Sequence, residues 1–410
     1  MSDFYTPQLD PLHPTRHLAA LDTPFGPRAV YDSVSFCNRC GSCQQACPTY
    51  LFTSQETFSP RGRNQLVRLI TEGKLKLTGE NRTLAEQALN TCLLCGRCTQ
   101  ACAGKIPTAE HMLELRRTLR SQPLPRLLFK LLSCRASHPH TFARLVRTGL
   151  WLRRIGLLRV ARTCGLTHLP GLNWLNHADD ILPAYPVRSD RDAWREALAD
   201  RPAVPTLLYL PSLEAEFLMP SLALSVLHLA RQKHRPFVLS NVSSGLFAYV
   251  YGDLRQSRRQ LRRLILRHGA VQNGTLPLLT DSVDVYLFLR RAPQLFAPWP
   301  RWQKKARQFA KHVVFVTDFL PAKSLSAGKS ARVRLDSGAL FAREGTPFDQ
   351  ARKILKTHFK KNFVECLYKD AGTPAFGYSF VRGNLGEKIC MSAVRSIART
   401  QTGTVFTLSG

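Results

Sequence analysis

Short apolar runs alternate with helical patterns along the last half of the chain. Seven runs are typical of buried strands: TLLYLP, PFVLS, LPLLTD, VVFVTDFL, RVRLD, NFVECL and TVFTL. Segments such as RWQKKARQFAK and FDQARKILKTHF separate several of them, and their apolar residues recur at helical spacing. This alternation predicts an α/β layer with a mainly parallel sheet.

The order of these runs repeats. TLLYLPS, PFVLSNVSSG and GTLPLLTDS recur as RVRLDS, NFVECLYKDAGTPAFG and GTVFTLSG, with one helix between successive strands in each half. Self-similarity of this kind indicates two similar α/β units. We expect one over residues 203–300 and the other over residues 301–410.

The first part of the chain has a helical pattern instead. Ser59 and Pro60 are typical of an N-cap and a first helical position, and the helix that they begin is expected to stop at Gly73. A second expected helix precedes Cys92, and a third is expected to be capped by Thr108. These elements predict a helical module.

Two runs of four cysteines lie in this helical module. CNRCGSCQQACP and CLLCGRCTQACAGKIP both have the spacing C-x2-C-x2-C-x3-C, and Ala103 of the second run stands where the first has Pro48. In bacterial two-cluster ferredoxins with this spacing, the fourth cysteine binds the other cluster. We therefore expect two 4Fe-4S clusters, the first held by Cys37, Cys40, Cys43 and Cys102 and the second by Cys92, Cys95, Cys98 and Cys47.

Zinc is the main alternative, because paired C-x2-C units also make tetrahedral sites of four thiolates. Zinc ribbons separate their two cysteine pairs, whereas each run here places four thiols within eleven residues, which favours iron-sulfur clusters. A disulfide framework is not favoured. The chain opens MSDFYTPQLDPLHPTRH, with no charged-then-apolar leader, so a cytoplasmic location is expected.

The charge of the chain is strongly positive, with a formal net charge of +30 and a pI near 10.3. Residues 115–178 contain 12 Lys and Arg and no Asp or Glu. This segment is leucine-rich, and helix breaks are expected at Pro139 and Gly149. Its combination of leucines and arginines predicts that residues 116–162 dock on an anionic membrane or an acidic partner. A packed helical linker whose arginines face water remains the alternative. Nucleic acid is not an expected partner, because no recognised binding motif occurs.

Together these patterns predict an α + α/β fold class with five segments. Residues 1–29 form an N-terminal extension and residues 30–120 a helical ferredoxin module with two 4Fe-4S clusters. Residues 121–202 form the basic helical connector. Residues 203–300 and 301–410 form a duplicated α/β domain with a mainly parallel sheet. No apolar run approaches the length of a membrane span.

The motifs resemble those of a known family. CNRCGSCQQACPTY, then SPRGR at residues 59–63, then CLLCGRCTQAC follow the order of the iron-sulfur subunits of the glycolate oxidase, lactate utilisation, glycerol-3-phosphate dehydrogenase and heterodisulfide reductase group. The resemblance implies an electron-transfer subunit that is not catalytic alone. It would relay electrons from a partner flavoprotein, which oxidises a 2-hydroxy acid such as glycolate or lactate, towards the respiratory chain at the inner face of the cell membrane. No flavin or nicotinamide is expected in this chain, which has neither a G-x-G-x-x-G after a strand nor a Walker loop.

The chain departs from that family in its last half, where the Cys-Cys-Gly repeats have no cysteines. Ser243, Ser244 and Gly245 stand at the first such position, and Thr373, Pro374 and Ala375 at the second. No cluster is therefore expected there. This loss also keeps open a second hypothesis, a cluster-bearing scaffold or redox sensor that binds a partner or nucleic acid without turnover. Four other cysteines are expected to be small core or near-core residues: Cys134, Cys164, Cys366 and Cys390.

Overall fold

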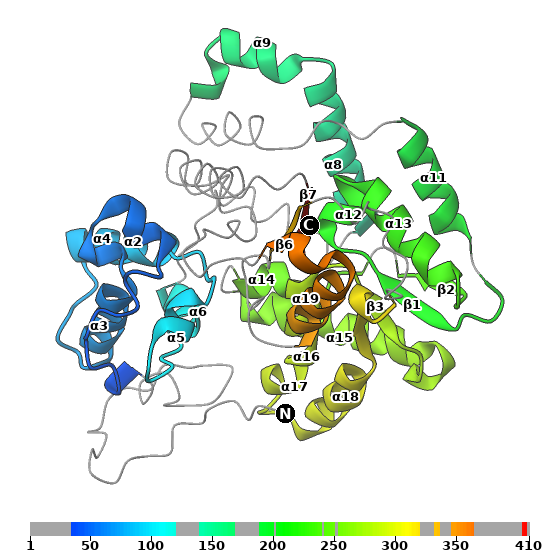
Figure 1. The fold of residues 1–410 in the computed structure, drawn as a ribbon. Coiled ribbons are helices and arrows are strands. Elements are labelled where there is room, and N and C mark those ends of the chain that lie inside the picture. The colour runs from blue at the N-terminus through cyan, green and yellow to red at the C-terminus, as the bar shows by residue number, and fades with distance from the viewer. Residues whose placement is uncertain are drawn as a thin grey trace.

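The computed structural model describes residues 34–119, 139–168, 188–200, 202–239, 242–250, 253–319, 332–336, 346–364 and 404–407. The described chain is mostly helical and contains two small sheets in which every strand pair is parallel (Figure 1). This agrees with the predicted α + α/β class.

The cysteine motifs lie in a helical module, at the left in Figure 1. The sequence sets the start of its central helix: the hydroxyl oxygen of Ser59 accepts a hydrogen bond from the backbone N–H of Gly62 at 2.9 Å, and Pro60 is the first helical residue. The predicted cap is confirmed. The elements of the module are α2 (Pro48–Thr53), η1 (Glu56–Phe58), α3 (Pro60–Thr71), α4 (Gly79–Asn90), α5 (Arg97–Ala101) and α6 (Thr108–Leu119).

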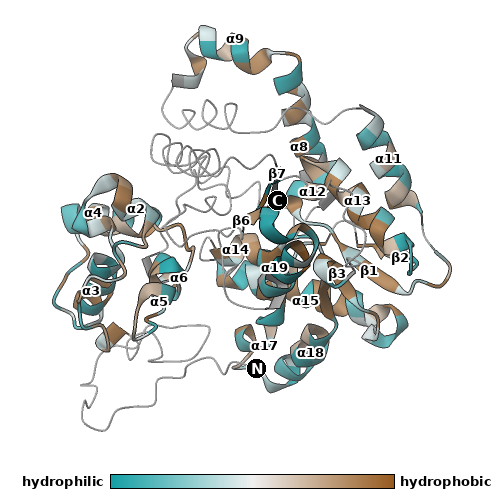
Figure 2. Cartoon of the chain, in the orientation of Figure 1, coloured by the Kyte–Doolittle hydropathy of each residue, from teal (hydrophilic) through white to brown (hydrophobic). Residues whose placement is uncertain are grey.

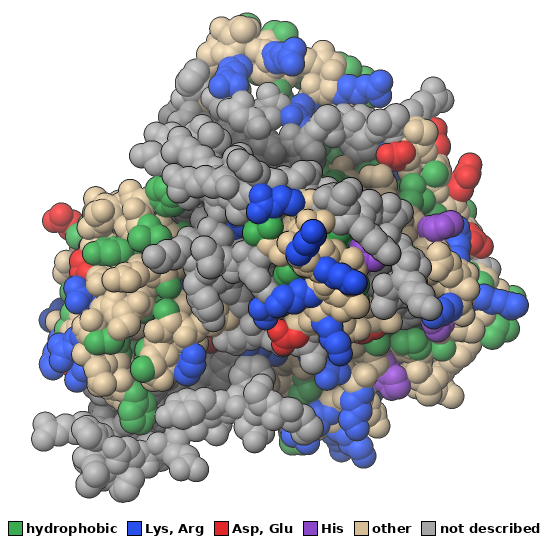
Figure 3. Space-filling model, viewed as in Figure 1, with side chains coloured by type: hydrophobic (Ala, Val, Ile, Leu, Met, Phe, Trp, Pro, Cys, Tyr) green, Lys and Arg blue, Asp and Glu red, His purple; other side chains and the backbone are tan. Residues whose placement is uncertain are grey.

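The connector is helical where it is described, and α8 and α9 stand at one edge of the molecule (Figure 1). Hydrophobic and hydrophilic residues alternate along them (Figure 2), and Lys and Arg side chains line this edge (Figure 3). The break expected at Gly149 is wrong, because this glycine lies within α8 and a single glycine costs a helix only about 1 kcal/mol. Gly156, at φ +81°, separates α8 from α9 instead. The elements are α8 (Pro139–Arg154), α9 (Leu157–Thr163), η2 (Leu166–His168) and α11 (Arg188–Ala199).

The first sheet has the strand order β2-β1-β3-β4. Both faces of β1 are buried: Leu207 and Tyr209 pack with α11 and α13, while Leu208 and Leu210 pack with the hydrophobic cluster on the other face. A strand covered on both sides explains why its sequence is a continuous apolar run. The strands are β1 (Leu207–Leu210), β2 (Pro236–Val238), β3 (Leu278–Thr280) and β4 (Val313–Phe315). The helical elements are α12 (Leu213–Phe217), α13 (Pro220–Arg231), α14 (Leu246–Val250), α15 (Leu254–Ala270), η3 (Gln272–Gly274), α16 (Val283–Arg290), α17 (Ala292–Leu295), α18 (Pro300–Lys311) and η4 (Val316–Phe319).

The second sheet has the order β6-β5-β7. It consists of β5 (Val333–Asp336), β6 (Phe363–Val364) and β7 (Thr404–Thr407), with α19 (Thr346–Phe359) and η5 (Lys360–Asn362) between β5 and β6. Each predicted apolar run contains one of the seven strands. In both sheets the first strand along the chain lies between the second and the third. Two helices, α12 and α13, lie between β1 and β2 where the sequence predicted one, and the duplication stays a prediction. The predicted boundary between the two units is at residue 300. The first sheet continues past it, because β4 pairs with β3.

The helical module packs against the first sheet domain. One hydrophobic cluster runs from Val67 and Met112 in the module to Leu208 and Leu278 in the sheet. The guanidinium of the fully buried Arg116, on α6, donates to the backbone oxygens of Leu89 and Cys92 at 2.8 Å and of Val250 at 3.3 Å. The second cysteine motif is thereby tied to α14.

Asp281 connects the carboxyl ends of β1 and β3. Its carboxylate accepts hydrogen bonds from the Tyr209 hydroxyl at 2.7 Å and from the Ser212 backbone N–H at 2.9 Å. Burial raises the pKa of Asp281 to about 6, and the charge of Glu214 adds to the increase. A folded state that holds this proton more tightly than the unfolded chain is stabilised at low pH, and that contribution is lost as the pH rises from about 4 through about 6.

Replacing Asp281 by Asn should flatten this pH dependence. The amide can keep both hydrogen bonds and cannot ionise, so the fall in the free energy of unfolding between pH 4 and pH 7 should be smaller than in the parent protein, by about 3 kcal/mol. Hydrogen exchange of the β1 and β3 amides at the two pH values measures the difference. Equal pH dependence in the two proteins would contradict the assignment to Asp281.

Candidate metal centre

The two cysteine motifs share one local backbone. In each, the residue before the second cysteine and the glycine after it have positive φ: Arg39 at 57° and Gly41 at 86° in the first, Leu94 at 56° and Gly96 at 69° in the second. Glycine adopts this conformation without strain, which explains the Cys-Gly pair in both motifs. Turns of this kind direct successive backbone N–H groups into a concavity that suits anions and iron-sulfur sites.

The fourth cysteine of the first motif lies among the first three of the second. Cys47, Cys92, Cys95 and Cys98 line one cavity. Burial raises the pKa of the Cys98 thiol well above its ordinary value, and the charges of Cys95, Cys92 and Cys47 contribute in the same direction. We call these four thiols the inner group, because Cys47 and Cys92 are buried.

The fourth cysteine of the second motif lies with the first motif. Burial raises the pKa of Cys43 to about 11, and the nearby thiols of Cys37 and Cys102 add to the shift. Cys40 is exposed, and the hydroxyl of Ser42, 3.4 Å from its sulfur, lowers its pKa. We call Cys37, Cys40, Cys43 and Cys102 the outer group. The folded chain thus brings together the two crossed sets that the spacing predicts.

The chemistry of these donors fits iron-sulfur clusters. A cluster needs thiolates, and raised pKa values mean that buried thiols lose their protons only if a cation compensates the charge. In the part of the chain that the structure describes, no three Cys, His, Asp or Glu side chains converge closely enough to hold a single ion. A 4Fe-4S cube does not require such close convergence, because each thiolate binds a separate iron and the four cysteine sulfurs are spaced around the cluster. That these eight cysteines are the ligands stays a prediction.

Arg63 lies beside the inner group and is fully buried on α3. Its guanidinium donates to the sulfur of Cys47 at 3.6 Å, to the Thr49 and Thr91 hydroxyls at 3.1 and 3.0 Å, and to the backbone oxygen of Ala88 at 3.0 Å. Burial opposes the charge of Arg63, but the thiols of Cys92 and Cys47 favour it, and its pKa is raised. Arg63 therefore supplies a fixed positive charge to a site that collects negative charge.

A hydrogen-bonded chain leads from the inner group into the core of the module. The Thr108 hydroxyl lowers the pKa of Cys98, opposing the effect of burial. The Asn64 side chain donates to that hydroxyl at 3.0 Å, and its oxygen lies 2.8 Å from Nδ1 of His111. Burial lowers the pKa of His111 to about 3, so the imidazole is neutral and Nδ1–H donates to Asn64. The sequence contained Arg63 within SPRGR but gave no signal for Asn64 or His111, because their role depends on tertiary contacts.

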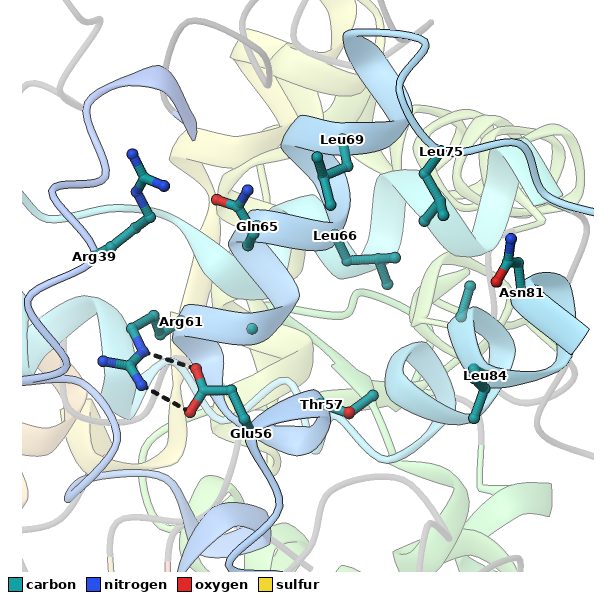
Figure 4. Close-up of a pocket in the computed structure, with 12 residues that line it drawn as sticks. Arg39, Glu56, Thr57, Arg61, Gln65, Leu66, Leu69, Leu75, Asn81 and Leu84 are labelled. Carbon is teal, nitrogen blue, oxygen red and sulfur yellow. Dashed lines mark hydrogen bonds and ion pairs between the residues drawn. The ribbon is translucent and has the colours of Figure 1, made fainter.

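A groove of about 570 Å³ lies between α3, α4 and the loop of the first motif (Figure 4). Leu66, Leu69 and Leu75 line its apolar part. At the other end Arg61 donates to Glu56 through Nε at 2.7 Å and Nη2 at 3.1 Å (Figure 4). The groove places an apolar surface beside the outer group.

The position expected for the first Cys-Cys-Gly sequence is the turn that leads into α14. The hydroxyl oxygens of Ser243 and Ser244 accept hydrogen bonds from the backbone N–H groups of Gly245 and Leu246, both at 3.3 Å. Gly245 has φ +89°, and a Cβ there would lie 2.7 Å from the backbone oxygen of Ser257. The glycine is thus required by the close approach of α15, although the cysteines are gone.

The remaining cysteines behave differently from the prediction where they are described. Cys164 is exposed at the end of α9, so its expected place in or near the core is wrong. The apolar pattern around it belongs to a helix that stands away from the sheets. Cys134, Cys366 and Cys390 lie outside the described residues, as does the second expected Cys-Cys-Gly position.

Comparison with known proteins agrees with the motifs. Residues 33–106 match the 4Fe-4S dicluster domain family. The chain is 32% identical over 122 residues to the glycolate oxidase iron-sulfur subunit of Escherichia coli (strain K12), an alignment that covers 28% of each chain. It is 29% identical over 162 residues to the "Probable glycolate oxidase iron-sulfur subunit" of Bacillus subtilis (strain 168), covering 38% of this chain and 35% of that one. No solved structure matches. The resemblance that the motifs predicted is confirmed, and less than two thirds of either relative is covered.

Proposed function

We propose that this chain is an electron-transfer subunit with two 4Fe-4S clusters, which accepts electrons from a flavoprotein dehydrogenase of a 2-hydroxy acid such as glycolate or lactate. The observation that carries the proposal is the gathering of the eight motif cysteines into two groups of four, each with one thiol from the opposite motif. Bound clusters would supply one-electron steps, whereas a flavin can divide a two-electron oxidation. The names of the two relatives support the choice of substrate class.

The two groups suit different positions in such a relay. The outer group includes the exposed Cys40, so a redox partner can approach it. In the inner group, the sulfur of Cys47 is contacted by the buried Arg63. The backbone of Cys92 is linked to the sheet domain through Arg116. We propose that electrons enter or leave through the outer cluster and that the acceptor belongs to the respiratory chain, reached from the cytoplasmic side of the membrane.

Anaerobic affinity purification of the whole chain from its own cells tests the proposal. A flavoprotein should co-purify, and glycolate or lactate should bleach the visible absorption of the clusters. Clusters that dithionite reduces but no 2-hydroxy acid does would contradict the proposed substrate class. Salt-sensitive binding to DNA without such reduction would favour a scaffold or sensor instead.

We also propose that α8 and α9 contact an anionic membrane surface. Large apolar side chains are about half exposed or more along this segment, and Arg147 and Arg159 of the same two helices are also exposed. An element with both kinds of side chain binds the interface by apolar burial and by attraction to anionic lipid. The apolar residues are Trp151, Ile155, Leu157, Val160 and Leu166. None of the described helices is long and apolar enough to cross a bilayer.

Reversing the charge of Arg147 and Arg159 should release the chain from vesicles that contain anionic lipid. Each cation near such a surface contributes about 1 kcal/mol, so Arg147→Glu with Arg159→Glu should weaken vesicle binding roughly thirtyfold or more. Sedimentation with vesicles measures the affinity, and iron content shows that the clusters are intact. Unchanged sedimentation would mean that these helices are a solvated linker.

A further inference from the structure

α15 presents an exposed stripe of arginines. The helix has six arginines and no acidic residue in LRQSRRQLRRLILRHGA. Four of them recur every four residues and are exposed: Arg255, Arg259, Arg263 and Arg267. Like charges at this spacing destabilise a helix, and none of the ion pairs among the described residues neutralises them. Stability of the fold alone therefore does not explain this stripe.

α18 packs beside α15 and extends the same charge. Its sequence PRWQKKARQFAK has five cations and no acidic residue, and all five are exposed. Lys and Arg side chains gather at this edge of the molecule (Figure 3). We call the exposed cations of α15 and α18 the basic face; the α18 members are Arg301, Lys304, Lys305, Arg307 and Lys311.

Aromatic rings hold cations in place between these helices. The guanidinium of Arg258 lies 4.7 Å from the ring centre of Trp299, and that of Arg262 lies 5.0 Å from the ring centre of Trp302. The ammonium of Lys305 lies 5.3 Å from the same Trp302 ring. Stacking on a ring fixes these cations without neutralising them, so they lose less conformational freedom when a partner binds.

The basic face lies next to the cluster module. α17 leads into α18, and Arg291 at the start of α17 pairs with Glu110 on α6 at 3.0 Å. Both side chains are mostly buried, at 17% exposure each. α6 is the helix that follows the second cysteine motif, so a protein bound to the basic face would also lie close to the module.

We propose that the basic face docks the carboxylate-rich face of a partner protein, namely the flavoprotein of the proposed function, on which this inference rests. Arginine and tryptophan are enriched in the centres of protein interfaces, and complementary charge accelerates association and fixes orientation. Two adjacent helices that carry only positive charge select an acidic surface.

Lipid and nucleic acid fit this face less well. The apolar residues of α15 are largely buried, so little apolar surface is left to enter a membrane, in contrast to α8 and α9. Single-stranded nucleic acid is held by stacking of bases on open aromatic rings, whereas Arg258, Arg262 and Lys305 already lie over Trp299 and Trp302.

The test uses the full cluster-loaded chain and two matched charge reversals. Arg259→Glu with Arg263→Glu changes the basic face, and Arg147→Glu with Arg159→Glu changes the charge equally at α8 and α9. Three probes are compared: the co-purified flavoprotein, a single-stranded oligothymidylate and vesicles with one third anionic lipid. Binding is measured at low and at high salt, and cluster reduction by hydroxy acid is followed in the same mixtures.

We expect the first variant to bind the flavoprotein about tenfold more weakly, with a reduced salt dependence, and the second variant to bind it as the parent does. Equal flavoprotein binding by all three proteins would overturn the docking surface, even if hydroxy acid still reduces the clusters. The docking surface would also be overturned if the first variant loses oligothymidylate or vesicle binding while its flavoprotein binding is unchanged. The basic face would then be assigned to nucleic acid or to anionic lipid, respectively. Weakened flavoprotein binding without cluster reduction by any hydroxy acid would uphold the surface and refute the proposed function.

Discussion

Replacing Cys102 by Ala should abolish the cluster of the first motif and leave that of the second. The reason is the grouping of the thiols: Cys102 lies with Cys43 and Cys37, while Cys47 lies with the second motif. Cys47→Ala should have the opposite effect. Iron content should fall from about eight atoms per chain to about four in either variant, because a cube without one thiolate is labile.

Electron paramagnetic resonance of the reduced proteins assigns the cluster that is lost. Cys40→Ala and Cys95→Ala provide the reference spectra, since each removes a cysteine that belongs to one motif under any assignment. Cys102→Ala should match Cys40→Ala, and Cys47→Ala should match Cys95→Ala. The reverse pattern would contradict the crossed grouping. Cys164→Ala is the control, because this exposed cysteine lies outside the module and its loss should leave both clusters. Two zinc atoms in the parent protein would contradict iron-sulfur clusters altogether.

Elements with strong local signals were predicted well. Every predicted strand run contains a strand. The clearest case is β1, whose two faces are both buried, so that its sequence is a continuous apolar run. The start of α3 was equally clear from the sequence, since the Ser59 hydroxyl caps a backbone N–H only three residues away and Pro60 has a fixed φ that suits the first helical position. The positive-φ turns around the second cysteine of each motif are local as well, since each ends on a glycine. The ligand assignment itself stays a prediction from the spacing.

Features that depend on tertiary contacts were not predicted. Cys164 has an apolar neighbourhood in the sequence, yet its helix lies at the edge of the molecule and leaves the thiol exposed. The place of β4 in the first sheet depends on its pairing with β3, which no local pattern reveals. Arg63 is the largest miss, because arginine is rarely buried without a partner and the partner here is a cysteine group brought close by folding.

Arg63→Gln should lower the reduction potential of the inner cluster and destabilise the module. Two unit charges about 6 Å apart at an effective dielectric constant of about 20 interact by nearly 3 kcal/mol, which corresponds to about 120 mV for one electron. Loss of the positive charge should shift the inner cluster by this order and the outer cluster by much less. Glutamine cannot replace all the hydrogen bonds that Arg63 makes to Thr49, Thr91 and the Ala88 oxygen, so the free energy of unfolding should fall by about 3 kcal/mol.

Two further variants separate charge from packing at Arg63. Arg63→Lys keeps the charge without the planar fork, so it should retain most of the potential while losing stability. Arg68→Gln, on the same helix, removes a surface arginine that pairs with Glu72, and it should change stability by less than about 1 kcal/mol and neither potential. Redox titration followed by electron paramagnetic resonance measures both potentials. If Arg63→Gln lowers stability but leaves the reduction potential of the inner cluster unchanged, Arg63 acts only on packing. If Arg63→Lys keeps the reduction potential and loses stability, the charge of Arg63 and its hydrogen bonds have separate roles.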